Sequence, residues 1–151
     1  MNRTYLWLAL ILTVTCLSVG NAVAHCEVPC GIYDDEMRTD MIAEHATTIE
    51  KAMSQILELS GDTPLNQNQL IRWVTNKEQH ATEIQHIVSQ YFLTQRIKPD
   101  AEKYGKKLEV LHQMLVAAMK CKQTVDTSYV EKLRSLLKEF EVLYFGHSHQ
   151  K

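Results

Sequence analysis

The chain has 151 residues, of which 45% are hydrophobic and 23% are charged, and its formal net charge is −2. These values fit one ordinary globular domain. No basic stripe with interleaved aromatic residues is present, and this argues against a nucleic-acid partner.

Residues 1–24 differ from the rest of the chain. Arg3 is their only charged residue, and residues 5–19 are mostly apolar. An A-V-A tripeptide at residues 22–24 then supplies the small-residue pattern at which signal peptidases cut. The apolar stretch is short and interrupted by polar residues, which favours the core of a signal peptide over a stable membrane span. We therefore expect a cleaved leader followed by a mature domain at residues 25–151.

The destination of the mature domain follows from the way in which the leader is removed. Cleavage by a signal peptidase predicts a protein exported to the periplasm or the extracellular space. A dedicated maturation protease acting at the same junction would instead leave the product in the cytoplasm or in an organelle lumen. In either case a leader-processing protease is an expected partner.

The mature chain is predicted to be all-α, because glycine and proline are scarce and strand-like alternation is absent. Apolar residues at helical spacing predict four helices, at about residues 34–59, 66–97, 100–120 and 127–145. Pro99 is expected to stop the second helix and to serve as the first residue of the third. Four amphipathic helices with short connections bury one another as an antiparallel up-down-up-down four-helix bundle, here at about residues 34–146.

Glutamate and histidine pairs in the second and third helices raise the question of a di-iron site inside the bundle. The pairs are Glu83-x-x-His86 and Glu109-x-x-His112. At about 100° per residue, His86 points almost directly away from the core face that contains Ile84, and Glu109 points outward in the same way. We therefore interpret both pairs as parts of solvated helix faces.

Three other parts of the chain carry potential metal ligands. His45 falls on the apolar face of the first helix and is predicted to be a core histidine with a hydrogen-bond partner, with a role at a metal site as the alternative. Cys121 is predicted to be a partly buried thiol at a helix end. His147 and His149 form an H-x-H pattern in a tail expected to fray, where adventitious metal binding is the alternative.

The remaining candidates are His25, Cys26 and Cys30, in the stretch HCEVPCGIY. Cleavage after residue 24 turns the nitrogen of His25 from an amide into a free amine. That amine, the amide nitrogen and thiolate of Cys26, and the thiolate of Cys30 can wrap one ion in a plane, with the His25 imidazole in axial reach. Planar nitrogen and sulfur ligation selects Ni(II) or Cu(II) over zinc and suits redox cycling. A Cys26–Cys30 disulfide is the alternative.

The pattern H-C-x-x-P-C-G-x-Y at residues 25–33 resembles the nickel-binding hook of nickel superoxide dismutases. The resemblance continues through NKEQHA, IKPDAEKY and the helix lengths. It implies a four-helix bundle with an N-terminal metal-binding hook, assembled as a homohexamer. It also implies dismutation of superoxide to oxygen and hydrogen peroxide, with one nickel ion per subunit alternating between Ni(II) and Ni(III).

The same resemblance implies roles for individual residues of the hook. His25, Cys26 and Cys30 would hold the nickel ion. Tyr33 would lie over the open axial side and order water or the incoming anion. His25 and Tyr33 are therefore the expected catalytic residues.

One stretch departs from the pattern of this family. Some members carry an arginine in a K-E-Q-R stretch, which supports the axial imidazole through a carboxylate. This chain reads K-E-Q-H at residues 77–80, so His80 would take the arginine's place. The carboxylate would come from Asp40 or Glu44.

Two functions of other classes compete with the enzyme. An exported nickel- or copper-binding or delivery protein could use the same hook without turnover. A structural helical bundle could carry a Cys26–Cys30 disulfide. Gly31 and Tyr33 favour the enzyme, because a carrier has no need of an aromatic hydroxyl beside the hook.

Overall fold

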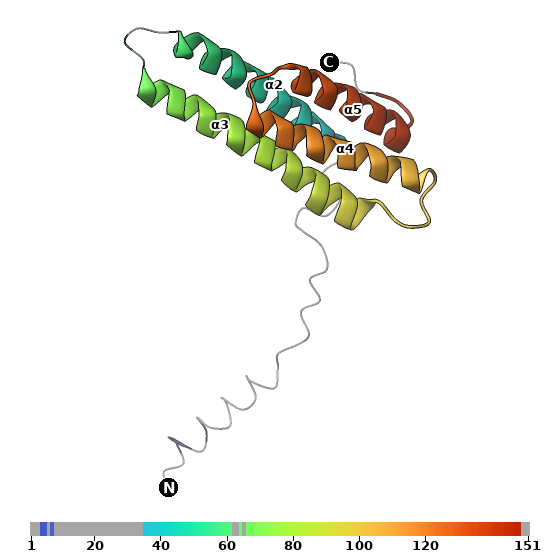
Figure 1. The fold of residues 1–151 in the computed structure, drawn as a ribbon. Coiled ribbons are helices and arrows are strands. Elements are labelled where there is room, and N and C mark those ends of the chain that lie inside the picture. The colour runs from blue at the N-terminus through green and yellow to red at the C-terminus, as the bar shows by residue number, and fades with distance from the viewer. Residues whose placement is uncertain (1–3, 6, 8–34, 62–63, 65, 149–151) are drawn as a thin grey trace.

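The computed structural model describes residues 4–5, 7, 35–61, 64 and 66–148. Its main elements are α2 (Asp35–Ser60), α3 (Gln67–His86), η1 (Ile87–Arg96), α4 (Tyr104–Gln123) and α5 (Ser128–Phe145). Figure 1 shows α2, α3, α4 and α5 side by side, each running opposite to the next one along the chain. Contacts join α2 to α3, α3 to α4, α4 to α5 and α5 back to α2. The predicted all-α four-helix bundle is confirmed, while the hook and all of the leader except residues 4–5 and 7 lie outside the described residues.

Local signals in the sequence explain where most of the helices begin and end. Acidic side chains occupy the first turn of α2, where they face the positive end of the helix dipole. The side chain of Asn66 caps α3 by accepting a hydrogen bond from the amide of Gln69 at 3.3 Å. Gly146 ends α5 with a φ of 85°, a left-handed conformation that glycine adopts without strain. The predicted bounds of the first and fourth helices are therefore confirmed to within about a residue.

The second helix changes its winding near its C-terminal end. The sequence predicts one helix over residues 66–97, but the last part is the π-helix η1. The amide of Ile97 donates to the carbonyl of Phe92 at 2.9 Å, five residues back. The side chain of Thr94 likewise reaches the carbonyl of Ser89 at 2.7 Å. Hydrophobic periodicity does not separate these two kinds of winding over so short a segment.

The prediction that Pro99 begins the third helix is wrong. Residues 98–103 form two successive turns, and α4 begins only at Tyr104. The amides of Ala101 and Tyr104 close these turns by donating three residues back, at 3.0 and 3.1 Å. Lys103 has a φ of 55°, an uncommon left-handed conformation that separates the turns from the helix.

The core consists of apolar side chains from all four helices and from η1. Phe92 and Phe140 are its largest fully buried members, and their rings meet edge to face with centroids 4.8 Å apart. Val74 falls on the apolar side of α3 by its helical spacing, but its side chain is 40% exposed. Figure 1 shows that the N-terminal end of α3 extends with α2 beyond the ends of α4 and α5. In the described part of the chain, no helix is long and apolar enough to cross a membrane.

Candidate metal centre

The residues predicted to hold and serve the metal all precede the described part of the bundle. Outside the described residues lie His25, Cys26, Cys30 and Tyr33. The described bundle begins with Asp35, the first residue of α2. Within the described residues, no three His, Cys, Asp or Glu side chains are gathered so that they could hold a metal ion. The described helices therefore contain candidate supporting residues for a hook but not the hook itself.

The two glutamate–histidine pairs of the helices lie at the surface. The side chains of Glu83, His86, Glu109 and His112 are all exposed. Lys106 contacts the carboxylate of Glu109 at 3.3 Å. The prediction that both pairs belong to solvated helix faces is confirmed, and neither pair is directed into the bundle as a di-iron ligand set would be.

His45 and His80 meet across two helices. The Nδ1 atom of His45, on α2, lies 2.8 Å from the Nδ1 atom of His80, on α3. One imidazole must donate and the other accept, so this contact holds a single proton between the two nitrogens. The predicted hydrogen-bond partner of His45 is confirmed, but the predicted core position is not, because the side chain is only partly buried. The identity of that partner has no signal in the local sequence, because 35 residues separate the two histidines.

The surroundings of His45 favour its uncharged form. Burial lowers the pKa of His45 most, and the charge that His80 can carry lowers it further. The carboxylates of Glu83 and Glu44 act in the opposite direction on the pKa of His45 but do not outweigh burial. Protonating both imidazoles would place two positive charges side by side in a partly buried position.

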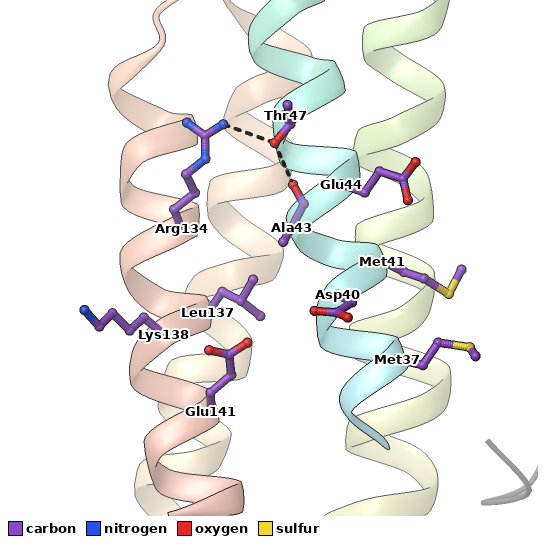
Figure 2. Close-up of a pocket in the computed structure, with 10 residues that line it drawn as sticks. All are labelled: Met37, Asp40, Met41, Ala43, Glu44, Thr47, Arg134, Leu137, Lys138 and Glu141. Carbon is purple, nitrogen blue, oxygen red and sulfur yellow. Dashed lines mark hydrogen bonds between the residues drawn. The ribbon is translucent and has the colours of Figure 1, made fainter. Parts of the chain in front are cut away.

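The two carboxylates considered as partners for the axial imidazole point to different sides of α2. Asp40 and Glu44 both line a cavity of about 960 Å³ between α2 and α5, and Arg134 and Glu141 also line it. Figure 2 shows the carboxylate of Asp40 directed toward α5 and that of Glu44 directed toward α3. Glu44 is therefore the carboxylate on the side of the histidine pair, in agreement with its effect on the pKa of His45.

A second polar group lies where the chain enters the bundle, and sequence reasoning missed it. We call Asp35, Tyr91, Arg96 and Tyr144 the Asp35 cluster. Oδ2 of Asp35 accepts hydrogen bonds from the Tyr144 hydroxyl at 2.7 Å and from Nε and Nη2 of Arg96 at 2.9 and 2.6 Å. Oδ1 accepts a hydrogen bond from the Tyr91 hydroxyl. In the sequence, Asp35 is an acidic residue near a helix start and the two tyrosines fall on apolar helix faces, so no local pattern indicates the cluster.

The electrostatics of the Asp35 cluster favour an ionised carboxylate and protonated hydroxyls. Burial by itself would raise the pKa of Asp35, but hydrogen bonds from Tyr91, Tyr144 and Arg96 together lower it. Burial, followed by the hydrogen bond to Asp35, raises the pKa of Tyr144 to about 12. The same causes raise the pKa of Tyr91. At neutral pH the cluster is thus a carboxylate held by a guanidinium and two phenols.

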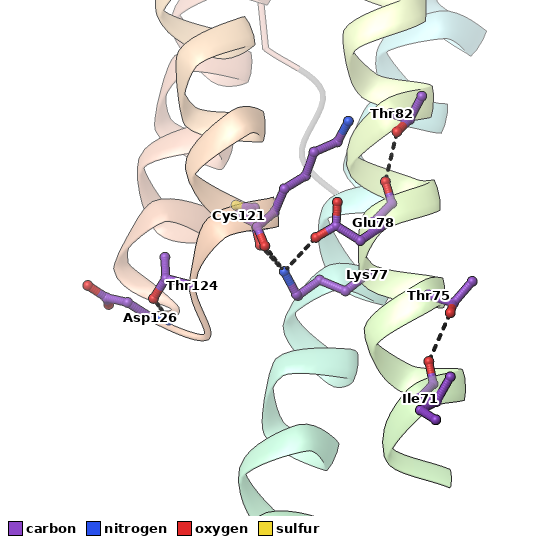
Figure 3. A network of polar contacts seen from close by, with 9 residues as sticks. Ile71, Thr75, Lys77, Glu78, Thr82, Cys121, Thr124 and Asp126 are labelled. Carbon is purple, nitrogen blue, oxygen red and sulfur yellow. Dashed lines mark hydrogen bonds and ion pairs between the residues drawn. The ribbon is translucent and has the colours of Figure 1, made fainter. Parts of the chain in front are cut away.

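The K-E-Q-H stretch also contains a lysine with a structural role. Lys77 is buried, and its ammonium donates to the carbonyl oxygens of Cys121, at 2.6 Å, and Lys122. Figure 3 shows this side chain reaching from α3 to the end of α4, where it also contacts Glu78 at 3.3 Å. A cation at this place satisfies carbonyls that have no partner within their own helix and faces the negative end of the helix dipole.

The third cysteine of the mature chain is fully buried rather than partly buried as predicted. Cys121 lies in the last turns of α4, and none of its side chain is exposed. Burial raises the pKa of Cys121 to about 11, although the nearby charge of Lys77 acts against this. A protonated, enclosed thiol is a poor nucleophile and a poor metal ligand.

The start of the C-terminal tail packs against the bundle. Nε2 of His147 lies 3.5 Å from Oε1 of Glu36, in the first turn of α2. A side chain of α2 thus gives His147 a contact that the tail's own composition does not reveal. His149 lies outside the described residues.

Comparison with known proteins adds one finding. A family model described as nickel-containing superoxide dismutase matches residues 20–148. The matched span contains the whole hook stretch together with every described helix of the bundle. No match was found among the curated proteins or among the solved structures.

Proposed function

The chain belongs to the family of nickel-containing superoxide dismutases, and from that premise we propose that its nickel ion is held by the hook at residues 25–33. The family makes the protein an oxidoreductase with a nickel cofactor and with superoxide as its substrate. The observation that carries the proposal is the donor set within the matched span. His25, Cys26 and Cys30 offer amine, imidazole, amide and thiolate donors, which suit planar nickel better than tetrahedral zinc.

The third cysteine of the mature chain, Cys121, supports this assignment because it is unsuited to bind a metal. Cys121 is buried, and its raised pKa of about 11 keeps it protonated. Two thiols of the mature chain, Cys26 and Cys30, are therefore the candidates for thiolate ligands. Their spacing around a proline suits a tight return between two sulfurs bound to one ion.

The chain's own groups divide the work of dismutation. Nickel, when bound, would supply the one-electron chemistry between Ni(II) and Ni(III). His25 would offer its amine and its imidazole to the metal. The hydroxyl of Tyr33 would order water or the incoming superoxide anion. Dismutation consumes a proton for each superoxide anion, so a hydroxyl and ordered water beside the site suit the reaction.

The histidine pair of the helices is proposed to support the hook. His80 stands where some family members have an arginine, and its partner across the helices is His45, at 2.8 Å. Of the two candidate carboxylates, Glu44 is favoured over Asp40 because its side chain is on the α3 side of α2. Groups that orient a ligand imidazole tune the metal without binding it.

Processing of the leader is part of the same proposal. Removal of residues 1–24 frees the amine of His25, so that cleavage precedes nickel binding. Export to the periplasm or the extracellular space follows from the signal-peptide pattern, with a cytoplasmic or organelle product as the alternative. The mature subunits are proposed to assemble as a homohexamer.

The proposed function is tested by the mass of the mature protein. The protein is purified with nickel and without reductant, and its intact mass and nickel content are measured. We expect a chain that starts at His25 and contains one nickel ion per subunit. A mature chain that starts elsewhere would refute the hook, because an acylated nitrogen cannot serve as an amine ligand.

A variant tests the role of the amine directly. An alanine inserted between Ala24 and His25, and retained after processing, is expected to abolish nickel binding and dismutase activity. Undiminished activity in this variant would contradict the assignment. A protein that binds nickel but does not consume superoxide would instead support the delivery function.

A further inference from the structure

The Asp35 cluster lies at the junction between the hook and the bundle. Asp35 is the first residue of α2 and follows Tyr33 by two positions in the sequence. Its carboxylate accepts hydrogen bonds from η1, through Tyr91 and Arg96, and from α5, through Tyr144. Three separate elements are thus tied together at the residue through which the hook joins the fold.

The π-helix η1 is what allows this arrangement. Tyr91 and Arg96 are five residues apart, and at about 100° per residue their side chains would point roughly 140° apart on an α-helix. The wider turn of a π-helix, with its bonds from residue i to i+5, brings residues five apart toward the same side. The guanidinium of Arg96 accordingly lies 5.7 Å from the centre of the Tyr91 ring, and both groups bind Asp35.

The cluster leaves the carboxylate of Asp35 little freedom to move. Its side chain is only 11% exposed, and Oδ1 and Oδ2 together accept bonds from two phenols and one guanidinium. Bonds between charged partners are shorter and stronger than neutral ones, and two guanidinium nitrogens fix the direction of approach. π-Helical segments are rare in proteins, and those that occur are often found at functional sites. A helix can begin without hydrogen bonds from two other elements to its first side chain, so the Asp35 cluster calls for a further explanation.

We propose that Asp35 is a positioning residue for the nickel site: the Asp35 cluster fixes the position and direction in which the hook leaves the bundle. The inference rests on the proposed function of residues 25–33. Asp35 would act through the stretch of chain that joins it to Tyr33 and Cys30. The chain offers a matched control, because Glu50 and Arg134 also join α2 to α5, at 2.8 Å, but far along α2 from the hook.

The experiment compares Asp35→Asn with Glu50→Gln in the full mature protein loaded with nickel. Nickel content, the electron paramagnetic resonance spectrum of the oxidised nickel, kcat and KM are measured. Asp35→Asn is expected to keep its nickel but to shift the spectrum and to lower kcat roughly ten- to hundredfold, the scale of a small misplacement of reacting groups. Glu50→Gln is expected to leave the spectrum and kcat unchanged. Equal effects of the two variants, or an unchanged spectrum in Asp35→Asn, would overturn the inference.

Two further measurements keep the outcomes separate. If Asp35→Asn does not fold, Tyr144→Phe replaces it, because this variant removes one hydrogen bond to Asp35 and keeps the aromatic ring. A smaller shift of the same spectrum is then expected, and its absence would overturn the inference. The variant Cys30→Ser tests the proposed function: full nickel content there would refute the hook itself. A hook that needs Cys30 but ignores Asp35 would refute only the positioning role.

Discussion

The Nδ1 atoms of His45 and His80 lie 2.8 Å apart, so that α2 and α3 are joined by a hydrogen bond between two imidazoles. One proton between the two Nδ1 atoms leaves both imidazoles neutral, whereas protonation of both rings would place like charges together in a partly buried position. Glu44 and Glu83 are the carboxylates that face His45, and they offset part of this repulsion. The relationship makes the joint between these helices sensitive to pH.

The first prediction concerns the stability of this joint in acid. The pKa of His45 is lowered in the folded protein, whereas an unfolded histidine titrates at about 6.5. Between those two values the unfolded state binds more protons, so the free energy of unfolding falls as the pH drops below about 6.5 and levels off below the folded pKa. Urea unfolding of the metal-free chain at several pH values measures this slope.

A matched pair of variants isolates the contribution of His45. His45→Gln keeps a hydrogen-bonding side chain next to His80 but does not titrate, so we expect a shallower slope below pH 6.5. His112→Gln changes an exposed histidine of α4 and should preserve the slope. An identical slope in the His45 variant and the unmodified chain would contradict the prediction.

The second prediction concerns the buried ammonium of Lys77. Lys77→Met keeps most of the volume of the side chain but leaves the carbonyl oxygens of Cys121 and Lys122 without their donor. Loss of hydrogen bonds from a charged group is expected to lower the free energy of unfolding by about 1.5–3 kcal/mol. Chemical denaturation measures the change. Lys120→Met is the control, because Lys120 donates only to the side chain of Gln123 at an exposed position, and it should stay within about 0.5 kcal/mol.

The third prediction separates the three thiols of the mature chain. The full sequence has four cysteines, and removal of the leader with Cys16 leaves Cys26, Cys30 and Cys121. In the folded, nickel-free and reduced protein we expect two thiols to be alkylated quickly and Cys121 slowly, because it is buried and its pKa is raised to about 11. Mass spectrometry after timed alkylation identifies each site.

The same measurement addresses the disulfide alternative. In protein purified without reductant and without nickel, two thiols should still be alkylated quickly if Cys26 and Cys30 are free thiols available to bind a metal. No fast thiol before reduction, and two after it, would favour a Cys26–Cys30 bond. Rapid modification of Cys121 in the folded state would contradict its buried position.

The sequence by itself was enough for the architecture of the bundle. Apolar residues at helical spacing and the capping positions are local signals, and they located the first and fourth helices closely. The outward phase of His86 and Glu109 is equally local, and the exposure of both side chains confirmed it. The proposed metal ligands all come from one short stretch, residues 25–33, so no tertiary contact is needed to recognise the hook.

Tertiary structure decided the contacts between distant residues. Asp35 meets Tyr91 and Tyr144 across 56 and 109 residues, and His45 meets His80 across 35. The π winding of η1 lies where Tyr91 and Arg96 both bind Asp35, and no local sequence pattern predicts it. Periodicity fixes which face of a helix is buried, because it depends on neighbours in sequence. Which polar groups meet there depends on how the four helices pack, and that is a property of the whole chain.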